Sequence, residues 1–241
     1  MELSFLTWNI WFKPYEIEER TKNIMDICHE LNPDFIAFQE VTPVSFNIIK
    51  NNLRDYKLSN DFLQQSYDTI LLSKYTCVYR QRTSLPDTKM GRNFLRGCYY
   101  VGEKEINIGT FHLESVFKEE ERSLKDIQLD LIYHTSPTKC IIMGDTNFLK
   151  EEKEPKDLVD LYNHTSNKDE CEYTYCGAKN MLISDKNKNS RFDRIYIKNY
   201  DFEIKDYKLV GIDNSLYYKS KKKNGPPSDH YGVYSKLLLK E

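Results

Sequence analysis

Residues 3–40 read LSFLTWNIWFKPYEIEERTKNIMDICHELNPDFIAFQE and carry two kinds of hydrophobic periodicity. In residues 3–11, large apolar side chains alternate with small polar ones, which is typical of a β-strand. Residues 17–31 carry one apolar stripe with a period of about 3.6 residues, which predicts an amphipathic helix. Asn32-Pro33-Asp34 should end this helix, and the apolar run at residues 35–38 predicts a second, buried strand.

This strand–helix–strand order predicts two neighbouring parallel strands joined by a right-handed crossover. Asn9 and Glu40 would then lie at the carboxyl ends of the two strands. Ligands of α/β proteins bind beyond those ends of the sheet. We therefore expect these two polar side chains to meet at one site, although they are far apart along the chain.

The rest of the chain contains many apolar segments of strand length and few of helix length. A second helix fits residues 119–132, where apolar residues recur at helical spacing. Further strands are predicted at residues 68–72, 98–101, 105–111, 139–143, 194–197 and 232–239. This balance predicts an α/β fold in which two sheets pack face to face with helices outside, rather than a doubly wound single sheet.

The length and composition suit a single folded domain at residues 1–241. Apolar residues make up 39% of the chain and charged residues 30%, and both are spread along its whole length. α/β proteins of this size commonly form one domain. The formal net charge of −2 neither supports nor excludes a nucleic-acid partner, because such a partner needs only a local basic surface.

Two further features bear on the compartment. The first residues lack a basic start followed by a long apolar run, and no stretch approaches the roughly 18 apolar residues of a membrane span. The six cysteines include no Cys-x-x-Cys pair, and we expect them to be reduced thiols. We therefore expect an intracellular protein without a membrane partner.

Five short segments place acids, amides and one histidine at predicted strand ends: Thr7-Trp8-Asn9, Gln39-Glu40, Gly144-Asp145-Thr146-Asn147, Arg191-Phe192-Asp193-Arg194 and Ser228-Asp229-His230. Each segment alone is weak evidence, because Asp-x-Asn is frequent in turns and a lone histidine is usually structural. Together, and in this order, they resemble the endonuclease/exonuclease/phosphatase superfamily. The resemblance implies a four-layered α/β sandwich, in which two packed mixed β-sheets are flanked by helices.

Within that superfamily, residues 87–95, 111–115 and 191–195 are similar to segments of the 5′-tyrosyl-DNA phosphodiesterases. The resemblance implies a DNA-repair hydrolase that cleaves the 5′-phosphotyrosyl bond between a topoisomerase-derived tyrosine or peptide and DNA, and leaves a 5′-phosphate. The DNA would be single-stranded near its terminus, topoisomerase II adduct peptides would be partners, and the enzyme would act as a monomer. The chain starts at the first catalytic strand, so we expect no N-terminal ubiquitin-binding domain.

The side chains of these segments suit a metal-dependent hydrolysis. Mg²⁺ prefers oxygen ligands, and one direct carboxylate can anchor it. We expect Glu40 to bind Mg²⁺, or Mn²⁺ in its place, with Asn9 and Asp229 as further metal candidates. Asp145 should accept the proton of the attacking water, and Asn147 should hold that water and a phosphate oxygen.

The terminal histidine should act on the phosphoryl group. His230 would stabilise the negative charge that develops on the phosphoryl oxygens. By resemblance, Asp193 would hydrogen-bond the imidazole ring and fix its tautomer. A tyrosyl leaving group departs readily as an anion, because a phenol has a pKa of about 10, so a strong general acid is not required.

Other residues are assigned to substrate or DNA binding by resemblance: Tyr67, His112, Ser115, Arg122, Tyr175, Arg191 and Arg194. Basic residues and stacking aromatic rings are what single-stranded nucleic acid requires. A solvated helix position for Arg122 and a core position for Tyr175 remain alternatives. The chain departs from its relatives at Leu149, where they carry an arginine.

Three other functions remain open. The same core could serve an apurinic-site endonuclease, or a phosphatase of lipids or inositols. A tyrosyl–RNA linkage is chemically close to the tyrosyl–DNA linkage. A binding protein on a retired nuclease scaffold is disfavoured, because the catalytic residues are all retained.

Overall fold

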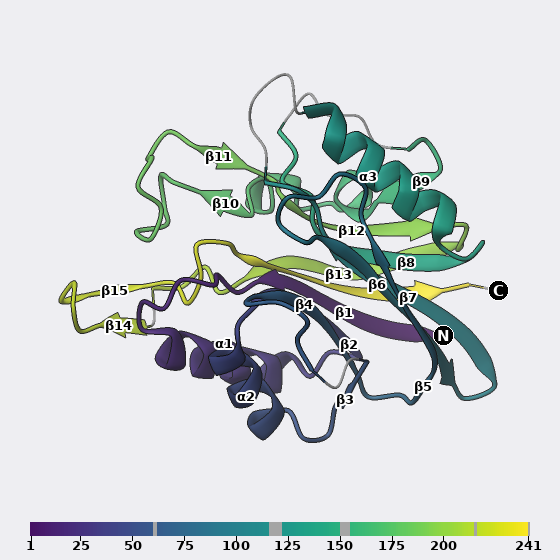
Figure 1. Cartoon of the computed structure of the whole chain (residues 1–241), viewed down its shortest axis with the longest axis horizontal. Coiled ribbons are helices and arrows are strands. Elements are labelled where there is room, and N and C mark those ends of the chain that lie inside the picture. The colour runs from purple at the N-terminus through teal and green to yellow at the C-terminus, as the bar shows by residue number, and fades with distance from the viewer. Residues whose placement is uncertain (60–61, 116–121, 150–154, 215, 241) are drawn as a thin grey trace.

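A computed structural model describes residues 1–59, 62–115, 122–149, 155–214 and 216–240, with the backbone alone for Arg122. In this part of the chain, two six-stranded sheets form the body of the protein (Figure 1). The first sheet has the order β13-β16-β1-β2-β4-β3, with strands at Phe202–Val210, Gly232–Leu239, Glu2–Asn9, Phe35–Val41, Asp68–Ser73 and Lys57–Leu58. The second has the order β5-β6-β7-β8-β12-β9, with strands at Cys77–Ser84, Asn93–Val101, Lys104–His112, Cys140–Asp145, Asp193–Lys198 and Leu158–Asp160.

Helices cover the outer faces of both sheets (Figure 1). The helices α1 (Ile17–Leu31) and α2 (Pro43–Asn52) lie on the first sheet, and α3 (Arg122–Thr135) lies on the second. Three apolar clusters fill the three spaces between these layers. The expectation of a four-layered α/β sandwich is therefore confirmed.

The alternation in β1 builds two of the three clusters. Leu3 and Phe5 belong to the cluster between the sheets, whereas Leu6 and Trp8 pack with the residues of α1 and α2. Successive side chains of a strand point to opposite faces, so one strand can fill both spaces. All four side chains are buried.

The helix ends follow local chemistry. Asn32 has a φ of 46° and its N–H donates to the carbonyl of Cys28, which ends α1 where the sequence predicts. α2 is not among the helices predicted from the sequence, although Thr42 and Ser45 form a capping box at its start. The reason is its weak apolar stripe, since only Ser45, Phe46 and Ile49 of α2 are buried.

Two long strands, β5 and β13, are also absent from the predicted elements. Both lie at the edges of their sheets. Most side chains of β5 are partly or fully exposed, and only the second half of β13 is mostly buried. Edge strands commonly carry charged side chains, so the apolar alternation that marks a central strand is weak there.

Register places the polar strand ends at one end of the sandwich. β1 and β2 are parallel with Asn9 opposite Gln39, and β7 and β8 are parallel with His112 opposite Asp145. β12 runs antiparallel to β8 and sets Asp193 opposite Asp145. Each sheet therefore contributes one parallel pair, and the carboxyl ends of both pairs face the same site.

Two hairpins, β10–β11 (Tyr175–Cys176 and Asn189–Ser190) and β14–β15 (Leu216–Tyr218 and Lys223–Gly225), project on this side (Figure 1).

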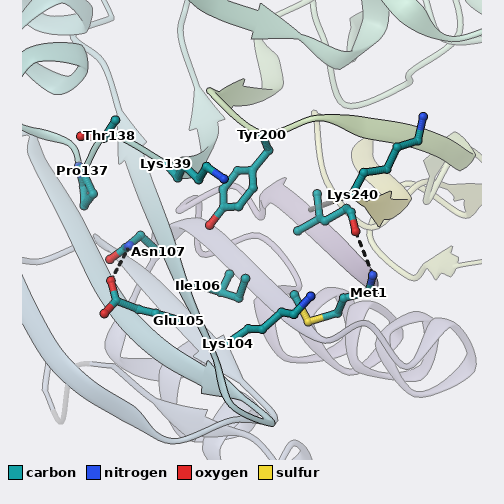
Figure 2. A pocket seen from close by; sticks show the side chains of 11 residues that line it. Met1, Lys104, Glu105, Ile106, Asn107, Pro137, Thr138, Lys139, Tyr200 and Lys240 are labelled. Atoms are coloured by element: carbon teal, nitrogen blue, oxygen red, sulfur yellow. Dashed lines mark hydrogen bonds between the residues drawn. The ribbon is translucent and has the colours of Figure 1, made fainter.

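A hollow of about 670 Å³ lies at the other end of the strands (Figure 2). Its lining includes Lys104 at the start of β7, Lys139 before β8 and Leu239 at the end of β16. None of the site residues predicted from the sequence lines it. The hollow is therefore separate from the polar cluster.

Two further expectations concern the cysteines and the membrane. All six cysteines are free thiols, as predicted, and five of them are buried. No helix in the described part of the chain is long and apolar enough to cross a membrane.

Shortening Phe5 should cost more stability than any comparable surface change. Its ring is fully buried and stacks on Phe35 with ring centroids 5.6 Å apart. We expect Phe5→Ala to lower the free energy of unfolding by about 3–5 kcal/mol, measured by chemical denaturation. Phe62→Ala is the control, because that ring is 66% exposed and its loss should cost less than about 0.5 kcal/mol. Equal losses for the two variants would contradict the assigned core.

Candidate active site

Asp145 lies at the centre of the polar cluster and is buried, with 1% of its surface exposed. Its Oδ2 accepts a hydrogen bond from Nδ2 of Asn9 at 2.9 Å and lies 3.3 Å from Nε2 of His112. Its Oδ1 accepts from the backbone N–H of Asn147 at 2.8 Å. Burial alone would raise the pKa of Asp145, but His112, His230 and Asn9 hold the pKa well below its ordinary value. Asp145 is therefore ionised at neutral pH.

His112 orients Asp145 and is itself oriented by Arg92. Nη1 of Arg92 lies 2.7 Å from Nδ1 of His112. A guanidinium group can only donate, so Nδ1 of His112 accepts and its Nε2 carries a proton for Asp145. His112 was predicted as a substrate contact, and the structure places it in direct contact with a predicted catalytic residue. Arg92 lies in the 87–95 segment but was not predicted as a site residue.

His230 forms a buried pair with Asp193, as the sequence predicts. Nδ1 of His230 donates to Oδ2 of Asp193 at 2.8 Å and lies 4.0 Å from Oδ2 of Asp145. Burial alone would lower the pKa of His230, but the carboxylates of Asp193, Asp145 and Asp229 raise it to about 10. The imidazole therefore carries a positive charge at neutral pH, a property that the sequence does not reveal.

The loop that carries His230 is fixed to β1. The hydroxyl of Ser228 donates to the carbonyl of Asn9 at 2.7 Å, and Nε1 of Trp8 donates to the carbonyl of His230 at 3.0 Å. The segment 228–230 therefore keeps a fixed position relative to Asn9.

Arg20 connects the same loop to the segment after β1, and it is not among the site residues predicted from the sequence. Its guanidinium is fully buried and donates to the carbonyls of Ile10 and Pro227 at 3.0 and 3.2 Å. One signal could have found it. Arg20 is three positions after Ile17 and four before Ile24, so it lies on the apolar stripe of α1, where a charged side chain needs a buried partner.

Three residues around the site have a left-handed backbone. Trp11 and Glu40 have φ of 61° and Asn147 has φ of 51°. Such conformations cost free energy for residues other than glycine, and they are most frequent at functional sites. Gly144 meets a different constraint, because a Cβ at this position would lie 2.1 Å from the carbonyl oxygen of Phe111.

Glu40, Asp229 and Asn9 offer oxygen donors for a metal. Oε2 of Glu40 accepts from the N–H of Phe12 at 2.9 Å, and Oδ1 of Asn9 accepts from the N–H of Trp11 at 3.0 Å. Burial raises the pKa of Asp229 to about 7, and the nearby charges of Glu40 and Asp145 also raise it, against the opposing effect of His230 and Arg20. Repulsion between carboxylates is what a bound cation relieves, and an all-oxygen donor set suits Mg²⁺.

A second group, Asp145, Asp193 and His230, also offers ligand atoms within 4.8 Å of one another and could hold a metal ion. However, the ring nitrogen of His230 in this group already donates to Asp193. A protonated imidazole cannot bind a metal. The carboxylates of Glu40 and Asp229 therefore fit a cation better.

The aromatic substrate candidates lie on two sides of the cluster. Tyr67 stacks on Phe12 with centroids 4.8 Å apart, and the Arg92 guanidinium lies 5.5 Å from the Tyr67 ring. Tyr175 lies 5.1 Å from the ring of His230 in an edge-to-face arrangement. The structure therefore brings both tyrosines to the site.

The remaining substrate candidates are Arg191, Arg194, Ser115 and Arg122. Arg191 is held by the buried carboxylate of Asp160, and Nη1 of Arg194 lies 3.6 Å from the same carboxylate. Both guanidinium groups therefore already have a partner. Ser115 is partly exposed at the end of a described segment, and the side chain of Arg122 lies outside the described residues.

The fold and the site define an α/β sandwich with a polar cluster suited to hydrolysis of phosphate esters. A family model described as "Endonuclease/Exonuclease/phosphatase family" matches residues 6–230, so the chain belongs to this family. As its description says, this family includes endonucleases, exonucleases and phosphatases.

Curated relatives and solved structures agree with this placement. Tyrosyl-DNA phosphodiesterase 2 of Mus musculus is 28% identical over 98% of this chain and 66% of its own length. The protein of the same name from Xenopus tropicalis is 27% identical over 95% of this chain and 64% of its own length. The chain thus spans about two thirds of these relatives. A crystal structure of D. rerio TDP2 complexed with single-strand DNA product has a TM-score of 0.86 at 20% identity, over 98% of this chain and 99% of that one, and shows the same fold.

Replacing Asp193 with Asn should lower the pKa of His230, because one of the carboxylates that hold the imidazolium is lost. In the unaltered protein this pKa is about 10, above the value of about 6.5 for an unfolded chain. The charge of His230 therefore contributes stability that is fully present below about pH 6.5 and is lost as the pH rises towards 10.

NMR titration of the imidazole C–H signals measures this pKa directly. We expect the His230 signals of Asp193→Asn to titrate at clearly lower pH than those of the unaltered protein. The signals of His134, on the exposed face of α3, should behave identically in both proteins. An unchanged His230 titration would refute the assigned pair.

Proposed function

We propose that the chain is a phosphodiesterase that uses a divalent cation, Mg²⁺ or Mn²⁺, to hydrolyse the 5′-phosphotyrosyl bond between a topoisomerase-derived tyrosine or peptide and a DNA 5′ end. The product would be DNA with a 5′-phosphate. The observation that carries this proposal is the charged His230–Asp193 pair beside the ionised carboxylate of Asp145. The curated relatives named tyrosyl-DNA phosphodiesterase 2 support the choice of bond. The role of a topoisomerase peptide and the monomeric state stay predictions.

His230 supplies positive charge where the reaction develops negative charge. A fixed donor aimed at the phosphoryl oxygens commonly gives the largest single contribution to catalysis. Asp193 keeps the ring charged and fixes its orientation, since it accepts the Nδ1 proton. Nε2 of His230 is then the atom that would donate to a phosphoryl oxygen.

Asp145 and Asn147 would place the attacking water. The low pKa of Asp145 keeps its carboxylate ionised, so that it can accept a hydrogen bond from the attacking water. Since the low pKa also makes it a weak base, it would take the proton of that water only as the new P–O bond forms, and the proton would then pass to the leaving phenolate or to solvent. Nδ2 of Asn147 donates to the carbonyl of Leu113 at 3.1 Å, which fixes the orientation of its amide. An amide adds no negative charge next to an anionic substrate.

Glu40, with Asp229 and Asn9, would hold the cation. When bound, such a cation polarises the phosphoryl group and offsets its charge. The ring pair of Phe12 and Tyr67 offers an aromatic surface for the tyrosyl leaving group, next to Arg92 and His112.

A 5′-tyrosyl oligonucleotide tests the proposal directly. Incubation with the protein and Mg²⁺ should release tyrosine and leave a 5′-phosphate, and a chelator should stop the release. Mass spectrometry of the oligonucleotide identifies the product. Absence of release, or release that persists with the chelator, would refute the proposal.

Three further substrates in the same assay separate the alternatives. An abasic duplex tests an apurinic-site endonuclease, a set of phosphoinositides tests a lipid or inositol phosphatase, and a 5′-tyrosyl oligoribonucleotide tests the RNA linkage. We expect the tyrosyl oligonucleotide to have the highest kcat/KM. A higher value for any other substrate would replace the proposed one.

A further inference from the structure

A lysine that belongs to none of the sequence motifs lies beside the catalytic histidine. Lys188 immediately precedes β11, and its backbone carbonyl accepts from the N–H of Gly177 at 2.9 Å across the hairpin. Its ammonium lies 5.5 Å from the ring of Tyr175 and 5.7 Å from the ring of Phe192. Both distances are those of cation–π contacts, which hold a flexible lysine side chain in place.

The same two rings flank His230. The centroid of the Tyr175 ring lies 5.1 Å from that of the imidazole, and the centroid of the Phe192 ring lies 5.8 Å from it. The Tyr175 and Phe192 centroids are 5.3 Å apart. The two rings therefore contact both Lys188 and His230, the residue that would face the scissile phosphate. Since His230 would itself face the scissile phosphate, an ammonium that contacts the two flanking rings would meet a neighbouring phosphate of the same strand.

A second ammonium strengthens the positive charge at this place. Lys125 is fully buried, and its Nζ donates to the carbonyl of Asn147 at 2.7 Å. Burial lowers the pKa of Lys188, and the charge of Lys125 lowers it further, against the opposing effect of Asp185. Lys125 thus adds positive charge near Lys188, Asp185 offsets part of it, and the positive charge that is left attracts a phosphate.

We propose that Lys188 binds the backbone phosphate that follows the scissile phosphodiester, and that Tyr175 and Phe192 hold its ammonium in position for this contact. The ligand class is a nucleic-acid strand with at least two phosphates. The charge of Lys125 adds to the attraction. This inference rests on the proposed function, because it assumes a nucleic-acid substrate with its scissile phosphate at His230.

The test compares two substrates that differ only in the number of phosphates. One is thymidine with a 5′-tyrosyl phosphate, which contains the scissile phosphate alone, and the other is a 5′-tyrosyl tetranucleotide. We expect Lys188→Ala to lower kcat/KM on the tetranucleotide about tenfold and to have a much smaller effect on the single-phosphate substrate. Lys188→Arg should restore most of the lost activity, because it keeps the charge.

Salt dependence gives a second readout that a purely structural role would not change. Loss of one phosphate contact should reduce the slope of log kcat/KM against log salt by about 0.7 on the tetranucleotide. Lys179→Ala removes an exposed lysine from the same hairpin and is the matched control. Its kinetics and salt slope should equal those of the unaltered protein.

Several results would overturn the inference. Equal losses on both substrates would assign Lys188 to the chemical step or to the structure of the hairpin, and no loss on the tetranucleotide would remove its role altogether. If the unaltered protein cleaves neither substrate, the proposed function fails instead. Fluorescence anisotropy with a 5′-phosphorylated tetranucleotide then tests the phosphate contact of Lys188 separately. Equal affinity of Lys188→Ala and the unaltered protein would overturn the proposed contact.

Discussion

The buried carboxylate of Asp145 is the constraint on which the site depends. An ionised group without water is costly unless several donors surround it. Asn9 comes from the first sheet and His112 from the second, and both contact the same carboxylate oxygen. The hydrogen bonds of Asp145 therefore join the carboxyl ends of β1, β7 and β8. A change in the packing of either sheet would leave this charge without part of its compensation.

The loop that carries His230 is held next to Asp145 by contacts with β1 and with the segment after it. The loop precedes β16, which pairs with β1. The Ser228 hydroxyl donates to the carbonyl of Asn9, and the Trp8 indole donates to the carbonyl of His230. Arg20 links the loop to the strained segment around Trp11. These contacts reach the backbone rather than the substrate, so their effect is to keep His230 in place relative to β1. The charge on His230 follows from this arrangement, because the three carboxylates close to the ring outweigh the opposing effect of its burial.

The sequence predicts the central parts of this protein and misses parts that depend on tertiary context. The strand–helix–strand start follows from periodicity. The pairing of His230 with Asp193 follows from the resemblance of the motifs to the family. The edge strands β5 and β13 are not, since exposed charged residues hide their alternation. Arg191 illustrates another difficulty. Its residue type suits DNA binding, but a buried carboxylate far away in the sequence, Asp160, is its partner in the fold. The single-domain interpretation stays a proposal.

The central claim is that His230, held charged by Asp193, stabilises the negative charge that develops at phosphorus. Single-turnover cleavage of a 5′-tyrosyl oligonucleotide by His230→Ala, with His134→Ala as the control on the exposed face of α3, tests it most directly. We expect a rate about 10²–10³ lower for His230→Ala, with little change in substrate affinity, and an unaltered rate for His134→Ala. A His230→Ala rate equal to that of the unaltered protein would contradict the role of His230 at phosphorus.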